Sequence, residues 1–434
     1  MRRITRTHML GSALAALALG LTTACGTSGP GADSDKAGVE VWMVEDASVN
    51  EVVQSAIDTY SKNAGIDGEL VTYVNDAYKQ RIQVALGSPE SPDVFFNWGG
   101  GNLAQYVKAN QVVDLTEAME ANPEFRDAFL PSVLDVAKID GSYYGVPMQG
   151  VLPVVLFYNK KVFKEVGVEP PTTYSELLDL VDTFKKEGIT PIVLPGAQAW
   201  TELMWLEYLT DRIGGAEVFQ AIAEGKEGAW KDPAIIKALE MCQDLVERGA
   251  FGDNFSSLTS DNGSASTVLA SGKGAMYLMG TWEISNQQEH NPDFLADGNL
   301  GFIAFPALED GKGDPAAIVG NPSNYFSVNS DSDNVDEAID FLVETMASDA
   351  YVEDLIEIGH VPAVAGIEDK LAETEHSEFT TFTYQLVAEA PSFTQSWDQA
   401  IPPAAAETML TNLQLVFLGD MTPEEFAEAM EATQ

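Results

Sequence analysis

Short apolar segments alternate with amphipathic ones along the chain from Val39 onward. The first hundred residues predict strands at 39–44, 69–74 and 92–96, and helices at 49–62 and 76–86. We expect Ser48 to be the N-cap of the first helix, because its hydroxyl can accept a hydrogen bond from the first turn. This alternation of strand and helix predicts a parallel sheet with helices on its faces.

The same alternation resumes after residue 150. It predicts strands at 151–158, 191–194, 274–279, 300–304 and 325–328, and helices at 160–166, 174–187, 201–212, 232–248 and 335–346. Two more helices are expected between 399 and 433, with a break near 419–423. The chain therefore contains a second α/β region as long as the first, which fits the two or three domains that 434 residues suggest.

Polar and aromatic residues follow the first and third predicted strands. Glu45 and Asp46 come after the first, and Asn97 and Trp98 after the third. Ligands of open α/β sheets bind beyond the carboxyl ends of the strands. These four residues are therefore the first candidates for a ligand site.

The N-terminus has a composition of its own. Three arginines within the first six residues precede an apolar run from Met9 to Leu21, which is too short to span a bilayer, and small residues lead to Cys25. This pattern is typical of a secretory signal, and its cysteine resembles that of a bacterial lipobox. We expect a signal peptide over 1–24 and a lipidated Cys25 that begins a flexible tether over 25–38. An ordinary cleaved signal with an incidental cysteine is the alternative.

The charge balance narrows the range of partners. The chain carries 23 Lys and Arg against 67 Asp and Glu, and loss of the three signal arginines changes the formal charge from −44 to −47. Such a field repels nucleic acid and anionic lipid, so we expect no nucleic-acid partner and membrane contact through the lipid anchor only. If Cys25 carries lipid, Cys242 has no thiol to pair with, and its helical apolar surroundings predict that it is buried.

Catalytic signatures are scarce. The four histidines lie at no metal-binding spacing, and neither a GxSxG elbow nor a GxxxxGK[ST] loop occurs. We expect no catalytic residue, no metal and no cofactor. A pair of carboxylates of the glycosidase type stays open, since 67 acidic residues provide many pairs.

Four tryptophans fall at predicted strand ends or in loops, each beside a side chain that can form hydrogen bonds: Trp98, Trp200, Trp282 and Trp397. A pyranose has an apolar C–H face and a rim of hydroxyls, so it is bound by flat aromatic platforms together with planar polar groups. These positions predict a carbohydrate site. Trp42 and Trp205 lie on regular elements and are expected in the core.

Three segments resemble motifs of extracellular solute-binding proteins of the maltose-binding type. Residues 155–163 (VLFYNKKVF) resemble YNKxxF, residues 171–177 (PTTYSEL) resemble PPxTWxEL with Tyr174 in place of Trp, and residues 272–282 (GKGAMYLMGTW) resemble GKxAMxxxGxW. The resemblance implies an α/β periplasmic-binding-protein fold: two Rossmann-like lobes joined by a hinge, with the ligand in the cleft between them. It implies an N-terminal lobe of 39–150 and 325–372 and a C-terminal lobe of 151–324 and 373–434.

Carried over by position, the resemblance places ten ligand-binding residues in the cleft: Glu45, Asp46, Asn97, Trp98, Gln149, Trp200, Trp282, Asn324, Trp397 and Asp398, with Asn321 beside the second chain crossing. It implies a monomeric, lipid-anchored receptor on the outer face of the plasma membrane that delivers a neutral di- or oligosaccharide to the permease subunits of an ABC importer. A xylobiose-like β-linked sugar is favoured. A ligand of another class, such as an amino sugar, and a secreted glycoside-active enzyme are the alternatives.

Overall fold

The computed structural model describes residues 38–433. The predicted signal peptide, Cys25 and the tether as far as residue 37 lie outside the described residues. Within 38–433, every helix is too short or too polar to cross a membrane.

The first sheet has five strands in the order β2-β1-β3-β12-β6. Their bounds are β1 (Gly38–Val44), β2 (Asp67–Tyr73), β3 (Val94–Asn97), β6 (Val146–Pro147) and β12 (Tyr325–Val328). β1 runs parallel to both β2 and β3, which confirms the parallel arrangement predicted from the alternation. β12 pairs antiparallel with β3 and β6, so a strand from far along the chain completes this sheet.

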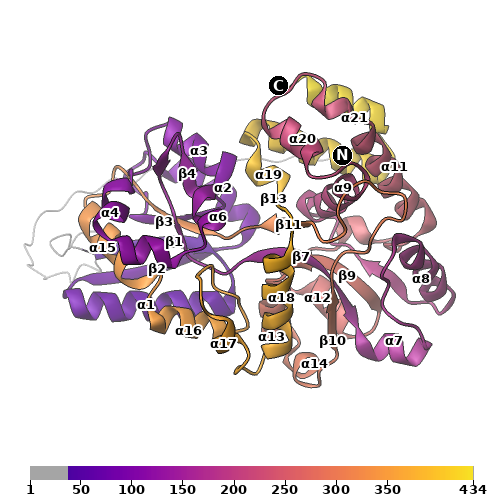
Figure 1. Ribbon diagram of the computed structural model, residues 1–434, viewed down its shortest axis with the longest axis horizontal. Helices are drawn as coiled ribbons and strands as arrows, with labels where there is room; N and C mark the ends of the chain where they lie inside the picture. Colours follow the sequence, from indigo (N-terminus) through magenta and orange to yellow (C-terminus); the bar gives the residue numbers. More distant parts are fainter. Residues whose placement is uncertain (1–37, 434) are drawn as a thin grey trace, which may run out of the picture. The chain divides into compact units, whose positions relative to one another are not determined.

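Helices and a small hairpin pack around the first sheet. They are α1 (Ala47–Ala64), α2 (Asn75–Ala85), α3 (Gly100–Lys108), α4 (Thr116–Ala121), α5 (Pro123–Ala128), α6 (Pro131–Leu134), the 3₁₀ turn η1 (Asp135–Ala137), β4 (Lys138–Ile139), β5 (Ser142–Tyr143), α15 (Val335–Thr345), α16 (Asp349–Glu357) and α17 (Glu368–Leu371). α1 lies beside α16, although nearly 300 residues separate them (Figure 1).

The N-cap predicted for α1 is wrong. The helix begins at Ala47, and its cap is Asp46, whose carboxylate accepts from the Val49 amide at 3.2 Å. Ser48 already lies inside the helix and donates instead to Gln288 Oε1 at 3.0 Å. Aspartate and serine both cap helices well, and here the helix begins early enough for Asp46, two residues before Ser48, to be the cap.

The second sheet has the order β13-β11-β7-β9-β8, with β10 also paired to β7. Its strands are β7 (Leu152–Asn159), β8 (Thr190–Val193), β9 (Gly274–Gly280), β10 (Leu300–Ile303), β11 (Ile318–Asn321) and β13 (Phe393–Gln395). β7 and β9 are buried along nearly their whole length, as expected for strands covered on both faces.

The helices of this second region are α7 (Lys160–Val166), α8 (Tyr174–Lys186), α9 (Ala199–Gly214), α10 (Glu217–Ala223), η2 (Ala229–Lys231), α11 (Pro233–Arg248), η3 (Phe255–Ser257), α12 (Ser264–Ala270), α13 (Glu283–His290), α14 (Pro292–Ala296), α18 (Ser377–Glu389), α19 (Trp397–Ala400), α20 (Pro403–Leu418) and α21 (Pro423–Glu431). Residues 201–212 of α9 are all buried. This helix therefore occupies the interior, between the sheet and the helices α11 and α20 that contact it.

Each sheet has its own hydrophobic core. One core gathers Val41, Phe95 and Phe326 with the helices of the first sheet, and the other gathers Phe157, Trp205 and Tyr277 with those of the second. Two separate cores are the mark of two lobes, so the predicted fold class is confirmed. As expected, Trp42 is buried (4% exposed), and Trp205 and Cys242 are fully buried (0% exposed).

The chain passes between the two cores three times, the last time between α17 and α18. It leaves β6 at Pro147 and enters β7 at Leu152, and it returns between β11 and β12. Gly150 lies at the first crossing, where an added Cβ would overlap the backbone of Val361. Only glycine lets these two segments run in contact, and the Val151 amide then donates to the Val361 carbonyl at 2.8 Å.

Candidate functional site

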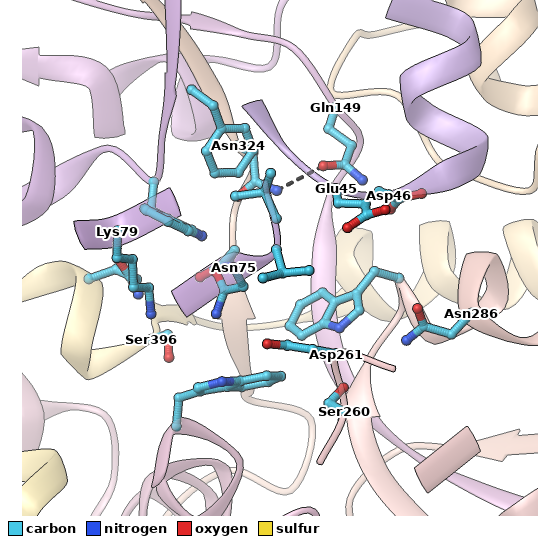
Figure 2. Close-up of a pocket in the computed structure, with 18 of the residues that line it drawn as sticks. Glu45, Asp46, Asn75, Lys79, Gln149, Ser260, Asp261, Asn286, Asn324 and Ser396 are labelled. Atoms are coloured by element: carbon cyan, nitrogen blue, oxygen red, sulfur yellow. Dashed lines mark hydrogen bonds between the residues drawn. The ribbon is translucent and has the colours of Figure 1, made fainter. Parts of the chain in front are cut away.

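A cavity of about 210 Å³ is lined by residues of both lobes (Figure 2). The first lobe contributes Glu45 and Asp46 directly after β1, Asn75 shortly after β2 and Trp98 directly after β3. Because these three strands are parallel, their carboxyl ends meet at one edge of the sheet. Three of the four residues predicted from the strand ends, Glu45, Asp46 and Trp98, therefore line the cavity.

Asn97, the fourth candidate, does not line the cavity. Its side chain is fully buried and donates to Ser327 Oγ at 2.8 Å, while its oxygen accepts from the Gly99 amide at 3.0 Å. Asn97 therefore fixes the turn into α3 and ties β3 to β12. Since successive strand residues face opposite sides, the neighbour of a cavity residue points away from it.

Two tryptophans of the second lobe line the cavity. Trp200 lies in the first turn of α9 and Trp282 directly before α13, with ring centroids 6.3 Å apart and planes inclined at 51°. Gly280 ends β9 beneath the second ring, and a Cβ at that position would overlap the indole. The glycine thus provides the space that lets Trp282 lie over the strand end.

Trp397 does not line the cavity, contrary to its expected place among the platforms. It is 1% exposed, its ring stacks on Phe219 at 4.6 Å and 6°, and it meets Trp230 edge-on. The physical reason is that α19 begins at Trp397, which directs this side chain toward α10 and η2 while Asp398 faces the cavity. Trp397 is a core residue.

The chain crossings contribute amide side chains. Gln149 lies at the first crossing, and Asn321 and Asn324 flank the second. Asn324 Nδ2 donates to Gln149 Oε1 at 2.8 Å, the bond drawn in Figure 2. The oxygens of Asn321 and Asn324 are buried with no hydrogen-bond partner among the described residues. The cavity therefore has acceptor groups next to the hinge segments.

Lys79 joins the two lobes across the cavity. Its ammonium group lies 3.6 Å from Asp398 Oδ2 and 5.1 Å from the centre of the Trp98 ring. Gln399 donates to Asp398 Oδ2 at 2.7 Å, and Ser396 Oγ lies 3.1 Å from Asp398 Oδ1. The ion pair therefore lies against an aromatic face, and both of its partners also line the cavity.

Five carboxylates line the cavity: Glu45, Asp46, Asp261, Glu289 and Asp398. Burial and, to a smaller extent, Glu289 raise the pKa of Asp46 to about 6, against the opposing effect of hydrogen bonds from the Val49 amide and the Ser285 hydroxyl. Burial also raises the pKa of Asp261, whose Oδ1 accepts from Gln198 at 2.7 Å. A cavity with these acceptors favours ligands rich in hydrogen-bond donors.

A neutral acid supports the wall behind Asp398. Glu207 on α9 is 1% exposed, and its Oε1 accepts from the Trp397 amide at 2.7 Å and from Ser396 Oγ at 3.0 Å. Burial raises its pKa to about 8, so it is largely protonated at neutral pH. Glu207 thereby fixes the segment that presents Asp398.

The cavity combines aromatic faces, amides and carboxylates. Within residues 38–433, no group of three His, Cys, Asp or Glu side chains has the geometry of a metal site. The polar groups of the wall are engaged with one another, as Asp398 is with Lys79 and Gln149 is with Asn324. Such an arrangement is suited to holding a hydroxylated ligand by stacking and hydrogen bonds.

Several lining residues were missed by the sequence reasoning: Asn75, Lys79, Ser260, Asp261, Asn286 and Ser396. Asn75 directly follows the predicted strand 69–74, so its position at a strand end was a signal for it. Lys79 lies one helical turn further along α2, on the same side as Asn75. The loop that brings Ser260 and Asp261 to the cavity is contributed by residues between η3 and α12, and no local pattern identifies it.

The profile of the bacterial extracellular solute-binding protein family matches residues 43–353. The chain belongs to this family. The match covers the first two crossings between the lobes and all the cavity residues from the first lobe.

Individual relatives agree with this family. An ABC transporter extracellular-binding protein of Pyrococcus horikoshii is 29% identical over 211 residues, which are 47% of this chain; the chain spans about half (45%) of that relative's length. A multiple sugar-binding protein of Streptococcus mutans is 23% identical, covering 75% of this chain and 79% of that protein.

A solved structure from work on xylan utilization by the thermophilic bacterium Caldanaerobius polysaccharolyticus has the same fold. It superimposes with a TM-score of 0.80 and 28% identity, covering 91% of this chain and 99% of that one. The family and these relatives are solute-binding proteins rather than enzymes.

Proposed function

We propose that this protein is the capture component of an ABC importer and binds a neutral di- or short oligosaccharide, with a xylobiose-like β-linked sugar favoured. The observation that carries the proposal is the pair of inclined indoles, Trp200 and Trp282, at a cavity otherwise lined by amides and carboxylates. The family membership and the sugar-related names of two relatives support it.

The inclination of the two indoles favours more than one sugar ring. Planes 51° apart cannot both lie flat on one face of a single pyranose, whereas a glycosidic linkage turns each ring relative to the next. Carboxylates and amides then accept from hydroxyls, and a charged acceptor strengthens each such bond. Micromolar affinity requires about 8 kcal/mol, which two stacked rings and a few charge-assisted hydrogen bonds supply.

The proposed mechanism is hinge closure on the ligand. The two lobes are taken as 39–150 with 325–372 and 151–324 with 373–434, joined at three crossings near Gly150, Asn324 and Ala372. A ligand that contacts both lobes stabilises the closed form by its differential affinity. The permease subunits would then recognise the closed receptor, which acts as a monomer anchored outside the membrane through lipid on Cys25.

Isothermal titration against a sugar panel tests this proposal. The panel contains xylobiose, cellobiose, maltose, xylose and glucose, and we expect heat with at least one disaccharide. Absence of heat with every member contradicts the carbohydrate proposal. Release of monosaccharide during the titration, followed by chromatography, would instead indicate a glycoside-active enzyme.

Tryptophan variants test the platform itself. Replacing Trp282 with Ala is expected to weaken binding at least tenfold, since a central aromatic contact commonly contributes about 2 kcal/mol or more. Trp282→Phe and Trp230→Phe form a matched pair, because the same change is made at the cavity and in the second core. Only the first of this pair is expected to alter affinity.

An amino sugar is the second candidate ligand, and the acidic lining favours it. Five carboxylates face the cavity against one lysine ammonium, which is engaged by Asp398. Titration with chitosan disaccharide, which carries ammonium groups, and with chitobiose, its neutral N-acetylated counterpart, separates the two candidates. Stronger binding of the charged sugar, lost on raising the salt concentration, supports the amino sugar.

A further inference from the structure

A line of largely buried polar side chains runs from the second chain crossing to Asp46 at the cavity. It passes through Asn324, Gln149, His360, Ser285 and Asp46, which come from five separate segments of the chain. The three middle members are at most 5% exposed. Such a network is costly unless all its members are satisfied, so its organisation has consequences for the cavity.

The direction of each hydrogen bond follows from the previous one. Asn324 donates to Gln149 Oε1 at 2.8 Å, which leaves the NH₂ group of Gln149 facing His360 Nδ1 at 3.5 Å. An amide NH₂ can only donate, so Nδ1 must be the acceptor. A neutral imidazole with an acceptor at Nδ1 carries its proton on Nε2, which lies 3.0 Å from Ser285 Oγ.

The last bond ends on the carboxylate. Ser285 accepts from His360, so its own hydroxyl proton is directed elsewhere, and its side chain hydrogen-bonds Asp46. That bond lowers the pKa of Asp46 against the larger effect of burial. With a pKa of about 6, the Asp46 carboxylate is ionised at neutral pH.

His360 is suited to the neutral role in the middle. Burial, with a smaller contribution from the neighbouring His376, lowers its pKa to about 4. Its segment is fixed by the backbone, since the His360 amide donates to the Leu355 carbonyl at 3.0 Å and Pro362 bridges to Gly150. The imidazole is therefore held beside the first chain crossing, next to Gln149.

We propose that His360 is a positioning residue for ligand binding: as the neutral Nε2–H tautomer it joins Gln149 to Asp46 through Ser285, in a chain of hydrogen bonds that all run in one direction. The chain orients the Gln149 amide with its second N–H available for a ligand hydroxyl and holds Asp46 as an acceptor. This inference rests on the proposed function, because it concerns how the same cavity is prepared for a sugar.

Ser285 lets this chain of hydrogen bonds connect the two lobes. It lies on α13, whose neighbour Ile284 belongs to the second core, while His360 and Asp46 adjoin segments of the first core. The hydrogen-bond chain is therefore complete only when α13 packs against α1. The cavity wall is expected to be fully ordered only where these two helices are in contact.

Measuring the tautomer of His360 tests the proposed chain of hydrogen bonds without any ligand. In protein labelled with ¹⁵N-histidine, long-range ¹H–¹⁵N spectra at pH 7 distinguish the two neutral tautomers, and the His360→Phe variant assigns the signal. We expect the Nε2–H form. The Nδ1–H form or a cationic ring would overturn the proposal, and this result stands whether or not a sugar binds.

A matched pair of variants tests the effect on binding. Ser285→Thr keeps the hydroxyl, and Ser285→Val has the same shape without it. With the disaccharide from the panel that gives the largest heat, we expect Thr to bind within about threefold of wild type and Val about tenfold more weakly, since a lost hydrogen bond to a charged group is of that size.

A purely steric role of Ser285 would change both variants equally, and that outcome would overturn the proposal. Circular dichroism and urea unfolding establish that each variant folds, and the His360 tautomer is recorded in each. If wild-type protein binds no sugar in the panel, the proposed function fails, while the tautomer measurement still shows whether the hydrogen bonds run in the proposed direction.

Discussion

Replacing Glu202 with Gln is expected to stabilise the protein increasingly as the pH rises. Glu202 lies on α9 two residues after Trp200 and is 0% exposed. Neither of its carboxylate oxygens has a hydrogen-bond partner among the described residues, and burial raises its pKa from 4.5 to about 8. The folded protein therefore keeps this side chain protonated over a range of pH in which the unfolded chain has released the proton.

The magnitude follows from proton linkage. Because the pKa is raised in the folded state, the native protein binds more protons than the unfolded chain between pH 4.5 and 8, and the free energy of unfolding falls as the pH rises through that window. Each unit of pKa difference corresponds to about 1.4 kcal/mol. Since titration is incomplete at both ends, wild type is expected to lose about 3 kcal/mol relative to Glu202→Gln from pH 5 to pH 8.

Urea unfolding of both proteins from pH 5 to pH 8 measures this difference. The other titrating groups cancel in the comparison, and the amide closely matches a protonated carboxyl in shape, so the two curves should lie near each other at pH 5 and separate above it. Glu227→Gln, the same change at an exposed position, is the control. Parallel curves for wild type and Glu202→Gln would show that Glu202 is ionised in the folded state and would refute the reasoning.

Three further changes have defined outcomes. Gly280→Ala is expected to displace the Trp282 indole and weaken sugar binding at least tenfold by calorimetry, with the circular dichroism spectrum unchanged. Lys79→Met removes the cation beside Asp398, so affinity for an ammonium-bearing sugar should rise and its salt dependence should steepen, whereas an unchanged titration would contradict this. Arg212→Met leaves the buried Asp211 carboxylate without its partner at 2.9 Å, and urea unfolding should show a loss of about 3–5 kcal/mol.

The regular elements were largely predictable, because hydrophobic periodicity is a local property. Strand β12 and helix α7 have the predicted bounds, and helix α8 differs at one end by one residue. Short strands such as β6 and β13 were missed, since two or three residues contain no period. That β12 completes the first sheet could not follow from its own residues, because its place depends on the chain returning from the second lobe.

The candidate site was predictable where a general rule connects sequence to position. Glu45, Asp46 and Trp98 lie at the cavity because strand ends in a parallel sheet converge. Trp397 shows the limit of that reasoning: its polar neighbours are those of a binding residue, but the direction of a side chain depends on helix phase, which is set by α10 and η2 from another part of the chain. Asp261 reaches the cavity through a loop whose course is a tertiary property.

The charge near the cavity is less negative than the formal net charge suggests, because two buried acids are largely protonated. With pKa values of about 8, Glu202 and Glu207 are largely neutral at pH 7, so the formal charge overstates the field that a ligand meets. Glu207 binds the Ser396–Trp397 segment as a neutral group, while Asp398 in the same segment forms the ion pair with Lys79. An ionised carboxylate at Glu207 would compete with Asp398 for the Lys79 ammonium and would repel the Asp398 carboxylate. Keeping Glu207 protonated therefore lets one acid fix the segment and the other present its charge to the cavity.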